Sequence, residues 1–196
     1  RWMTAAPPGV ARSASRSSRK VSKRCGSAMT VLEDLVTSCR AALAAADPGA
    51  VVASVLEPVV ARPETFRDDL EALRATPGGA AIIHRSDELT VLGLEVAPGF
   101  VSPPHNHTVW AVVGVYQGAE DNIFYRRTSQ GIEETGRGVL RTGDCLALPE
   151  DAVHGIANSG TLPLLALHVY GGDLFATSRS QWDESLTVEM PFGTRS

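Results

Sequence analysis

Apolar positions between residues 29 and 79 recur every three or four residues, which is the spacing of amphipathic helices. The first predicted helix opens with a capping box in which Thr30 precedes Glu33 by three positions. A second short helix is predicted over 50–57. A third follows Pro63, which suits a first helical turn, and runs to about Arg74. We therefore predict an N-terminal helical segment.

From Ala80 onward the pattern changes to short β-rich runs punctuated by Gly, Pro, Asn and Asp. The runs are AAIIHR, LTVLGLEV, VWAVVGVYQG, NIFYRR, GVLRT, CLALP, VHGIAN and LLALHVYGG. Evenly spaced short strands are typical of an antiparallel sandwich or closed barrel and argue against alternating strands and helices. The prediction is a mainly β fold, with a barrel over 80–196 and the helical segment 29–79 packed on it.

Charge is distributed unevenly along the 196 residues. The first 28 residues hold seven of the 18 basic residues and none of the 22 acidic ones, so residues 29–196 carry a net charge of −11. An acidic body is a poor surface for nucleic acid, and no apolar run approaches the length of a membrane span. We expect neither nucleic acid nor a membrane as a partner.

Residues 1–28 are rich in Ser, Arg, Ala and Pro and lack apolar periodicity, which is typical of a disordered segment. A transit peptide or a nucleic-acid-binding arm would also have this composition. We favour a non-native or untranslated extension before a natural start at Met29, because the helix signals begin immediately afterwards.

The three cysteines, Cys25, Cys39 and Cys145, are odd in number and show no CxxC spacing. This pattern fits no disulfide framework and favours a reducing compartment, so we expect a cytoplasmic protein. Cys145 lies in an apolar run and is interpreted as a small buried hydrophobic residue.

Two segments of the predicted barrel combine glycine with histidine at regular spacing. In the first, five residues separate Gly99 from His105-Asn106-His107, and ten more precede Gly118. The second contains Gly143, Pro149, His154 and Asn158 in that order. Alternate residues of a strand point to the same face, so His105 and His107 can share the barrel interior with a histidine from a facing strand. Three neutral imidazoles suit Fe, Zn, Cu or Ni.

These two segments resemble the paired motifs of the cupins, G-x5-H-x-H-x3,4-E-x6-G and G-x5-P-x-G-x2-H-x3-N. The resemblance implies a double-stranded β-helix, or jelly-roll barrel, that binds a metal through His105, His107 and His154. Two positions depart from the motifs. Asp151 replaces a glycine, and the metal-binding glutamate falls at Ala111 or Val112. Three neutral ligands would leave a divalent metal its full charge and open positions, which favours an anionic substrate that binds through two donors.

The segments APGFVSPPHNHTVWAVVGVYQGAE and LALHVYGGDL further resemble thiol dioxygenases, a group that includes cysteine dioxygenase and 3-mercaptopropionate dioxygenase. In that family a Ser-His-Tyr relay places a tyrosine hydroxyl near the iron. Here His168 and Tyr170 match the relay, and Ala166 replaces the serine. An arginine after the tyrosine approaches the substrate carboxylate in the bacterial branch, and Arg179 stands in that region. By themselves, His168 and Tyr170 also fit a packed strand pair in the core, and Arg179 judged alone fits a surface or interface arginine.

Two further departures concern the branch of the family and its substrate. Val112 stands near a cysteine that animal cysteine dioxygenases cross-link to a tyrosine, which favours the bacterial branch. The family also places an arginine or glutamine on the strand before the first motif, a position that falls near Ala80. Only His84 and Arg85 are polar candidates close to it.

The resemblance implies an Fe(II)-dependent dioxygenase that converts a small thiol carboxylate, cysteine or 3-mercaptopropionate, to its sulfinic acid with O2. Tyr170 and His168 would be catalytic and Arg179 would bind substrate; the resemblance also allows a homodimer. A second enzymatic hypothesis keeps the three-histidine iron but takes a β-diketone or another chelating carbon acid as substrate. A third is a metal-binding or small-molecule-binding cupin without catalysis.

Overall fold

The computed structural model describes residues 29–75 and 79–193, and the predictions for residues 1–28 and for the turn at 77–78 lie outside them. The N-terminal helices are α1 (Val31–Ala42), α2 (Pro48–Val60), the 3-10 helix η1 (Pro63–Thr65) and α3 (Arg67–Ala72). Thr30 caps α1 through the predicted capping box, because its side chain accepts from the Glu33 amide and the Glu33 carboxylate accepts from the Thr30 amide.

All strand pairs within the described residues are antiparallel and form two sheets. One sheet has the order β1 (Ala81–Arg85), β2 (Thr90–Val96), β9 (Leu164–Tyr170), β4 (Ala111–Gln117) and β7 (Cys145–Leu148). The other has the order β11 (Glu189–Pro191), β10 (Ser180–Trp182), β3 (His105–Asn106), β8 (Val153–Ala157), β5 (Ala119–Thr128) and β6 (Gly131–Arg141).

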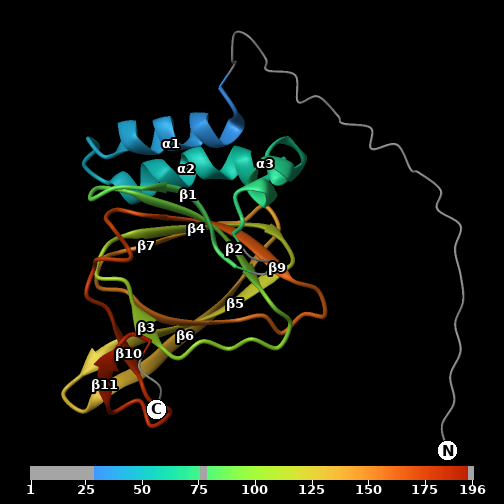
Figure 1. Ribbon diagram of the computed structural model, residues 1–196. Helices are drawn as coiled ribbons and strands as arrows, with labels where there is room; N and C mark the ends of the chain where they lie inside the picture. Colours follow the sequence, from blue (N-terminus) through green and yellow to red (C-terminus); the bar gives the residue numbers. More distant parts are fainter. Residues whose placement is uncertain (1–28, 76–78, 194–196) are drawn as a thin grey trace, which may run out of the picture.

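Figure 1 shows the helices stacked on the outer face of the β1-β2-β9-β4-β7 sheet, with the second sheet on its opposite side. The predicted fold class, a mainly β jelly-roll barrel with N-terminal helices, is confirmed. Each predicted β-rich run contains a strand. The predicted bounds of one strand and two helices were wrong. Strand β6 begins at Gly131 instead of Gly138, α2 continues past Pro58 to Val60, and the third helix divides into η1 and α3.

Burial of apolar side chains on both faces of the β1-β2-β9-β4-β7 sheet fixes the layers. On the outer face, α2 packs closely against β4 at Gly114, which has no side chain. A Cβ atom added at this position would lie only 2.7 Å from Leu56 Cδ2. Fully buried Val60 joins the same core, and this packing explains why α2 does not stop at Pro58. The inner face carries smaller clusters, one of which includes Leu92 and Tyr170. The space between the sheets is therefore the candidate location for chemistry.

The sequence led us to expect no membrane-spanning segment and no disulfide bond. Among the described residues, no helix has both the length and the apolarity required to cross a membrane. Cys39 and Cys145 both carry free thiols, and burial raises the pKa of each to about 12, so both thiols stay protonated near neutral pH. The reducing, cytoplasmic compartment remains a prediction.

Candidate metal centre

Three imidazoles meet between the two sheets. His105 lies on β3, His107 follows that strand, and His154 lies on β8 as the direct partner of His105 in the ladder. Their ring centroids are 4.8 to 5.1 Å apart, and one nitrogen from each ring lies within 4.8 Å of the others. All three side chains are buried. Within the described residues this is the group of His, Cys, Asp and Glu side chains able to hold a metal ion.

The double proline before the first histidine fixes the strand that carries it. The carbonyl of Pro103 lies 3.0 Å from Nδ1 of His105, so Nδ1–H donates to it and Nε2 is left as the metal-binding nitrogen. The carbonyl of Pro104 accepts from the backbone amide of Trp182, which ties β3 to β10. Just past His107, Thr108 adopts a positive φ of 56° and turns the chain toward β4.

His154 is oriented by a side chain from the neighbouring strand β5. Its Nδ1 lies 2.9 Å from Oδ1 of Asn122, which is also buried. Its Nε2 is buried and has no hydrogen-bond partner among the described residues. A buried imidazole nitrogen without a partner is costly in an apolar interior, and a metal ion would satisfy it.

The protonation states of the three histidines suit metal binding. Burial lowers the pKa of His105 to about 4 and that of His154 to about 3. Burial also lowers the pKa of His107, and the neighbouring imidazoles lower it further. All three rings are therefore neutral near pH 7, which is the form that coordinates a metal.

The structure decides which residue occupies the place of the missing glutamate. Ala111 packs inside the barrel with Leu148 and Tyr170, whereas Val112 packs on the opposite face of β4 against the helices. Ala111 is therefore the neighbour of the histidines, and its methyl group cannot coordinate. An all-imidazole set of three fits Fe, Zn, Cu or Ni, and the geometry by itself does not select among them.

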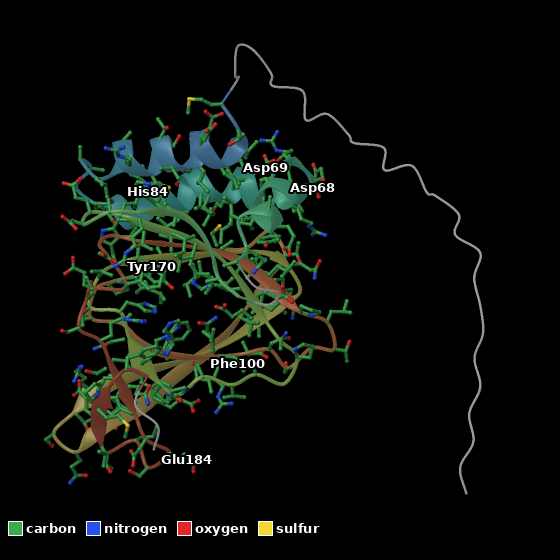
Figure 2. All side chains as sticks on the ribbon, in the orientation of Figure 1. Asp68, Asp69, His84, Phe100, Tyr170 and Glu184 are labelled. Carbon is green, nitrogen blue, oxygen red and sulfur yellow. The ribbon has the colours of Figure 1, made fainter. Side chains whose placement is uncertain are left out.

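Tyr170 and His168 lie beside this centre on β9. The ring of Tyr170 meets the ring of His107 edge to face with centroids 5.1 Å apart, and Figure 2 shows Tyr170 between the two sheets. The Tyr170 hydroxyl lies 3.1 Å from Nδ1 of His168. Nε2 of His168 has no partner in the described part of the chain, consistent with Ala166 in place of a serine. Burial raises the pKa of Tyr170, so the phenol stays protonated.

Arg179 is held next to the histidine segment from both sides. Thr108 Oγ1 donates to the carbonyl of Ser178 at 2.9 Å, and the amide of Ser180 donates to Oδ1 of Asn106 at 2.8 Å. The guanidinium of Arg179 stacks 4.1 Å from the centroid of Phe192. The guanidinium forms no ion pair with any residue that the structure describes. Burial lowers the pKa of Arg179.

The cleft beside Arg179 has a volume of about 580 Å³ and is lined also by Phe192. The centroid of the Phe192 ring lies 5.3 Å from that of His105, so Phe192 stands between this cleft and the histidines. A half-buried cation without an acidic partner, at the edge of a metal centre, can bind an anionic group of a ligand.

The two polar residues near the start of the barrel have partners other than the three histidines. His84 lies on the side of the sheet that the helices cover, as Figure 2 shows, and its Nε2 is 3.3 Å from Ser86 Oγ. Arg85 is paired with Asp173, with Nη2 2.9 Å from Oδ2. Arg85 lies on the same face of the sheet as Tyr170, because it pairs with Thr90 and Thr90 pairs with Tyr170, but its guanidinium is engaged by Asp173.

Two interior residues of β5, Glu120 and Asn122, were not predicted from the sequence. Both are buried, and Asn122 joins Glu120 to His154 by hydrogen bonds. The available signal was strand parity, since Glu120, Asn122 and Phe124 alternate along β5 and share its inner face. The predicted run began only at Asn122, so this alternation was too short to recognise.

No family model matches the chain. Among solved structures, it is similar to a recombinant oxalate oxidase in complex with glycolate, at 20% identity and a TM-score of 0.40, over 50% of this chain and 53% of that chain. It is also similar to the DMSP lyase DddQ from Ruegeria pomeroyi DSS-3, at 22% identity and a TM-score of 0.39, over 48% of this chain and 43% of that chain.

A third similar structure is an uncharacterized conserved protein with a double-stranded β-helix domain from Klebsiella pneumoniae. Here the identity is 20% and the TM-score 0.45, over 58% of this chain and 88% of that chain. The match to the first two structures spans only about half of their length. At these identities and scores, no substrate or reaction is carried over from them.

Proposed function

We propose that this chain is a cupin-type metalloenzyme that binds Fe(II) through His105, His107 and His154 and oxidises a small thiol carboxylate with O2. Cysteine and 3-mercaptopropionate are the candidate substrates, and the product is the sulfinate. The observation that carries the proposal is a group of three imidazoles able to hold a metal ion, with an arginine at its edge that forms no ion pair with any described residue. The balanced reaction is RS⁻ + O2 → RSO2⁻, in which sulfur is oxidised and both oxygen atoms are added to it.

The charge of the centre favours an anionic substrate. The three ligands are neutral and no carboxylate belongs to their group, so the full charge of a divalent ion would remain. When bound, Fe(II) would supply the redox chemistry and favour the ionised form of a coordinated thiol. The metal charge would attract the thiolate, and Arg179 would receive the carboxylate at the other end of the substrate.

The remaining polar side chains have roles that follow from their contacts. Tyr170 presents a phenol that keeps its proton near neutral pH, since burial raises its pKa. His168 holds the phenol oxygen at 3.1 Å and so orients it toward the histidine cluster. Tyr170 would therefore donate a hydrogen bond to substrate or oxygen at the centre, and Leu92, Ala111 and Leu148 would exclude water from the same space.

A β-diketone, or another chelating carbon acid, is the second candidate substrate. The observation that favours it is the apolar wall around Tyr170, formed by Leu92, Ala111, Leu148 and Leu174. Such a wall suits a substrate without a charged amine. The lack of a second polar residue from β1, where His84 and Arg85 are engaged elsewhere, points in the same direction.

The test is anaerobic reconstitution with Fe(II), followed by measurement of O2 consumption with cysteine, 3-mercaptopropionate and acetylacetone. The proposal expects one sulfinate formed per O2 consumed with a thiol carboxylate, detected by mass spectrometry. Consumption with acetylacetone alone would support the second candidate. An iron-loaded protein that consumes no O2 with any of the three would indicate a metal-binding protein without this activity.

A further inference from the structure

A carboxyl group lies inside the barrel without a counterion. Glu120 is 0% exposed, and none of the ion pairs formed among the described residues includes it. One of its oxygens, Oε2, has no hydrogen-bond partner in the described part of the chain. Burial of a carboxylate away from water costs several kcal/mol unless other interactions compensate. A residue of this kind in an apolar interior is therefore a candidate for a specific role.

The other oxygen of Glu120 begins a chain of hydrogen bonds that ends at the metal centre. Asn122 Nδ2 donates to Glu120 Oε1 at 2.9 Å, and Asn122 Oδ1 lies 2.9 Å from His154 Nδ1. All three side chains are at most 2% exposed, so water does not compete for these contacts. This series of hydrogen bonds joins two strands, β5 and β8, that are neighbours in the second sheet.

The chemistry of the three side chains determines which atom donates and which accepts in each of the two hydrogen bonds. Asn122 Nδ2 donates to Glu120 Oε1, an oxygen that can accept whether or not Oε2 carries a proton, so the NH2 end of the Asn122 amide faces Glu120. The carbonyl end then faces His154 and accepts a proton from Nδ1. A neutral imidazole protonated at Nδ1 carries its lone pair on Nε2, the nitrogen that has no other partner.

We propose that Glu120 is a positioning residue of the metal centre, which acts through Asn122 to hold His154 in the Nδ1-protonated tautomer with Nε2 free for the metal. The inference rests on the three-histidine centre of the proposed function and not on its substrate.

The first test reads the tautomer in the metal-free protein. Long-range ¹H–¹⁵N spectra of ¹⁵N-histidine-labelled protein distinguish imidazoles protonated at Nδ1 from those protonated at Nε2. Wild type should show His154 in the Nδ1-protonated form alone. In Glu120→Gln, both ends of the new amide can face Asn122, so a mixture of tautomers is expected. An unchanged His154 tautomer in folded Glu120→Gln protein would overturn the inference.

The second test measures Zn²⁺ affinity by competition with a chromophoric chelator. Glu120→Gln and Asn122→Leu should each weaken binding by about 10- to 100-fold, the usual effect of losing a partner of a metal ligand. If Glu120 acts through Asn122, the double variant should bind no more weakly than Asn122→Leu. Losses that add in the double variant would contradict the inference.

The matched control is Val115→Ala, another fully buried barrel residue, which lies outside the hydrogen-bond chain. It should lower the free energy of unfolding and leave the Zn²⁺ affinity of the folded protein unchanged. An equal loss of affinity in this control and in Glu120→Gln would show that packing alone is responsible, against the inference. Wild-type protein that binds no Zn²⁺ would refute the metal centre itself, whereas normal binding by Glu120→Gln would refute only the role of Glu120.

Discussion

Mild acid should unfold the metal-free protein more readily because four buried histidines resist protonation. Burial lowers the pKa of His105 and His168 to about 4 and that of His154 to about 3, and it lowers the pKa of His107 as well. In the unfolded chain each returns to the ordinary value of 6.5. Between these values the unfolded state binds more protons than the folded state, so the free energy of unfolding falls as pH falls.

The size of the effect can be worked out for a change from about pH 7.5 to about pH 5.5. At the lower pH each histidine is protonated in roughly nine-tenths of the unfolded molecules and in almost none of the folded ones. This difference lowers the free energy of unfolding by about 1.3 kcal/mol per histidine. The four histidines together cost about 5 kcal/mol. This figure barely depends on the folded values, provided that they stay well below the lower pH.

Glu120 acts in the opposite direction. Burial raises the pKa of Glu120 from 4.5 to about 7. At about pH 5.5 the carboxyl group is therefore mostly protonated in the folded state and mostly ionised in the unfolded chain. This contributes about 2 kcal/mol of stability on acidification, which leaves a net loss of about 3 to 4 kcal/mol. Typical domains have unfolding free energies of about 5 to 15 kcal/mol, so the change is a large part of the total.

The assay is urea denaturation at both pH values in the presence of EDTA, with a constant slope confirming two-state behaviour. Val115→Ala removes no titratable group, so it should show the same pH difference as wild type and serves as the control. Glu120→Gln should lose about 5 kcal/mol, because the opposing group is gone. A wild-type loss below about 1 kcal/mol would refute the reasoning, since it would mean that the cluster accepts protons without unfolding.

Three other variants test the site and its support. Tyr170→Phe removes the hydroxyl that His168 orients and should lower kcat for sulfinate formation by about 10- to 100-fold, the loss expected for one hydrogen bond to a charged group. Fe(II) affinity should not change, and steady-state kinetics and metal titration measure the two quantities. Arg179→Gln removes a charged hydrogen-bond donor and should raise KM for 3-mercaptopropionate by about 10- to 100-fold, whereas KM for acetylacetone should not change. Gly114→Ala places a Cβ 2.7 Å from Leu56 Cδ2 and should cost about 1 to 3 kcal/mol in thermal unfolding, whereas an unchanged Tm would contradict the packing of α2 on β4.

The fold class could be read from the sequence because its signals are local. The capping box at Thr30 and the alternation within runs such as LTVLGLEV each depend on residues a few positions apart. A short strand was missed for the same reason. Strand β10 has three residues, too few for a periodic pattern, and it exists because it pairs with the distant strand β3.

The histidine set of the candidate metal centre was also predicted, from the spacing of two motifs. Motif spacing left open whether Ala111 or Val112 stands where a glutamate would coordinate, and the parity of β4 decided it in favour of Ala111. In the same way, Arg85 was a candidate for substrate recognition until the structure showed its ion pair with Asp173, 88 residues away.

The sequence by itself determined the helices, the longer strands and the two motifs that carry the three histidines without the motif glutamate, because these depend on neighbours along the chain. Only the tertiary structure decided what surrounds the histidines. The Glu120–Asn122–His154 chain and the attachment of Arg179 to the histidine segment both join residues more than 30 positions apart. Such contacts are set by strand register and closure of the barrel, and a one-residue shift in register would turn each of these side chains to the other face.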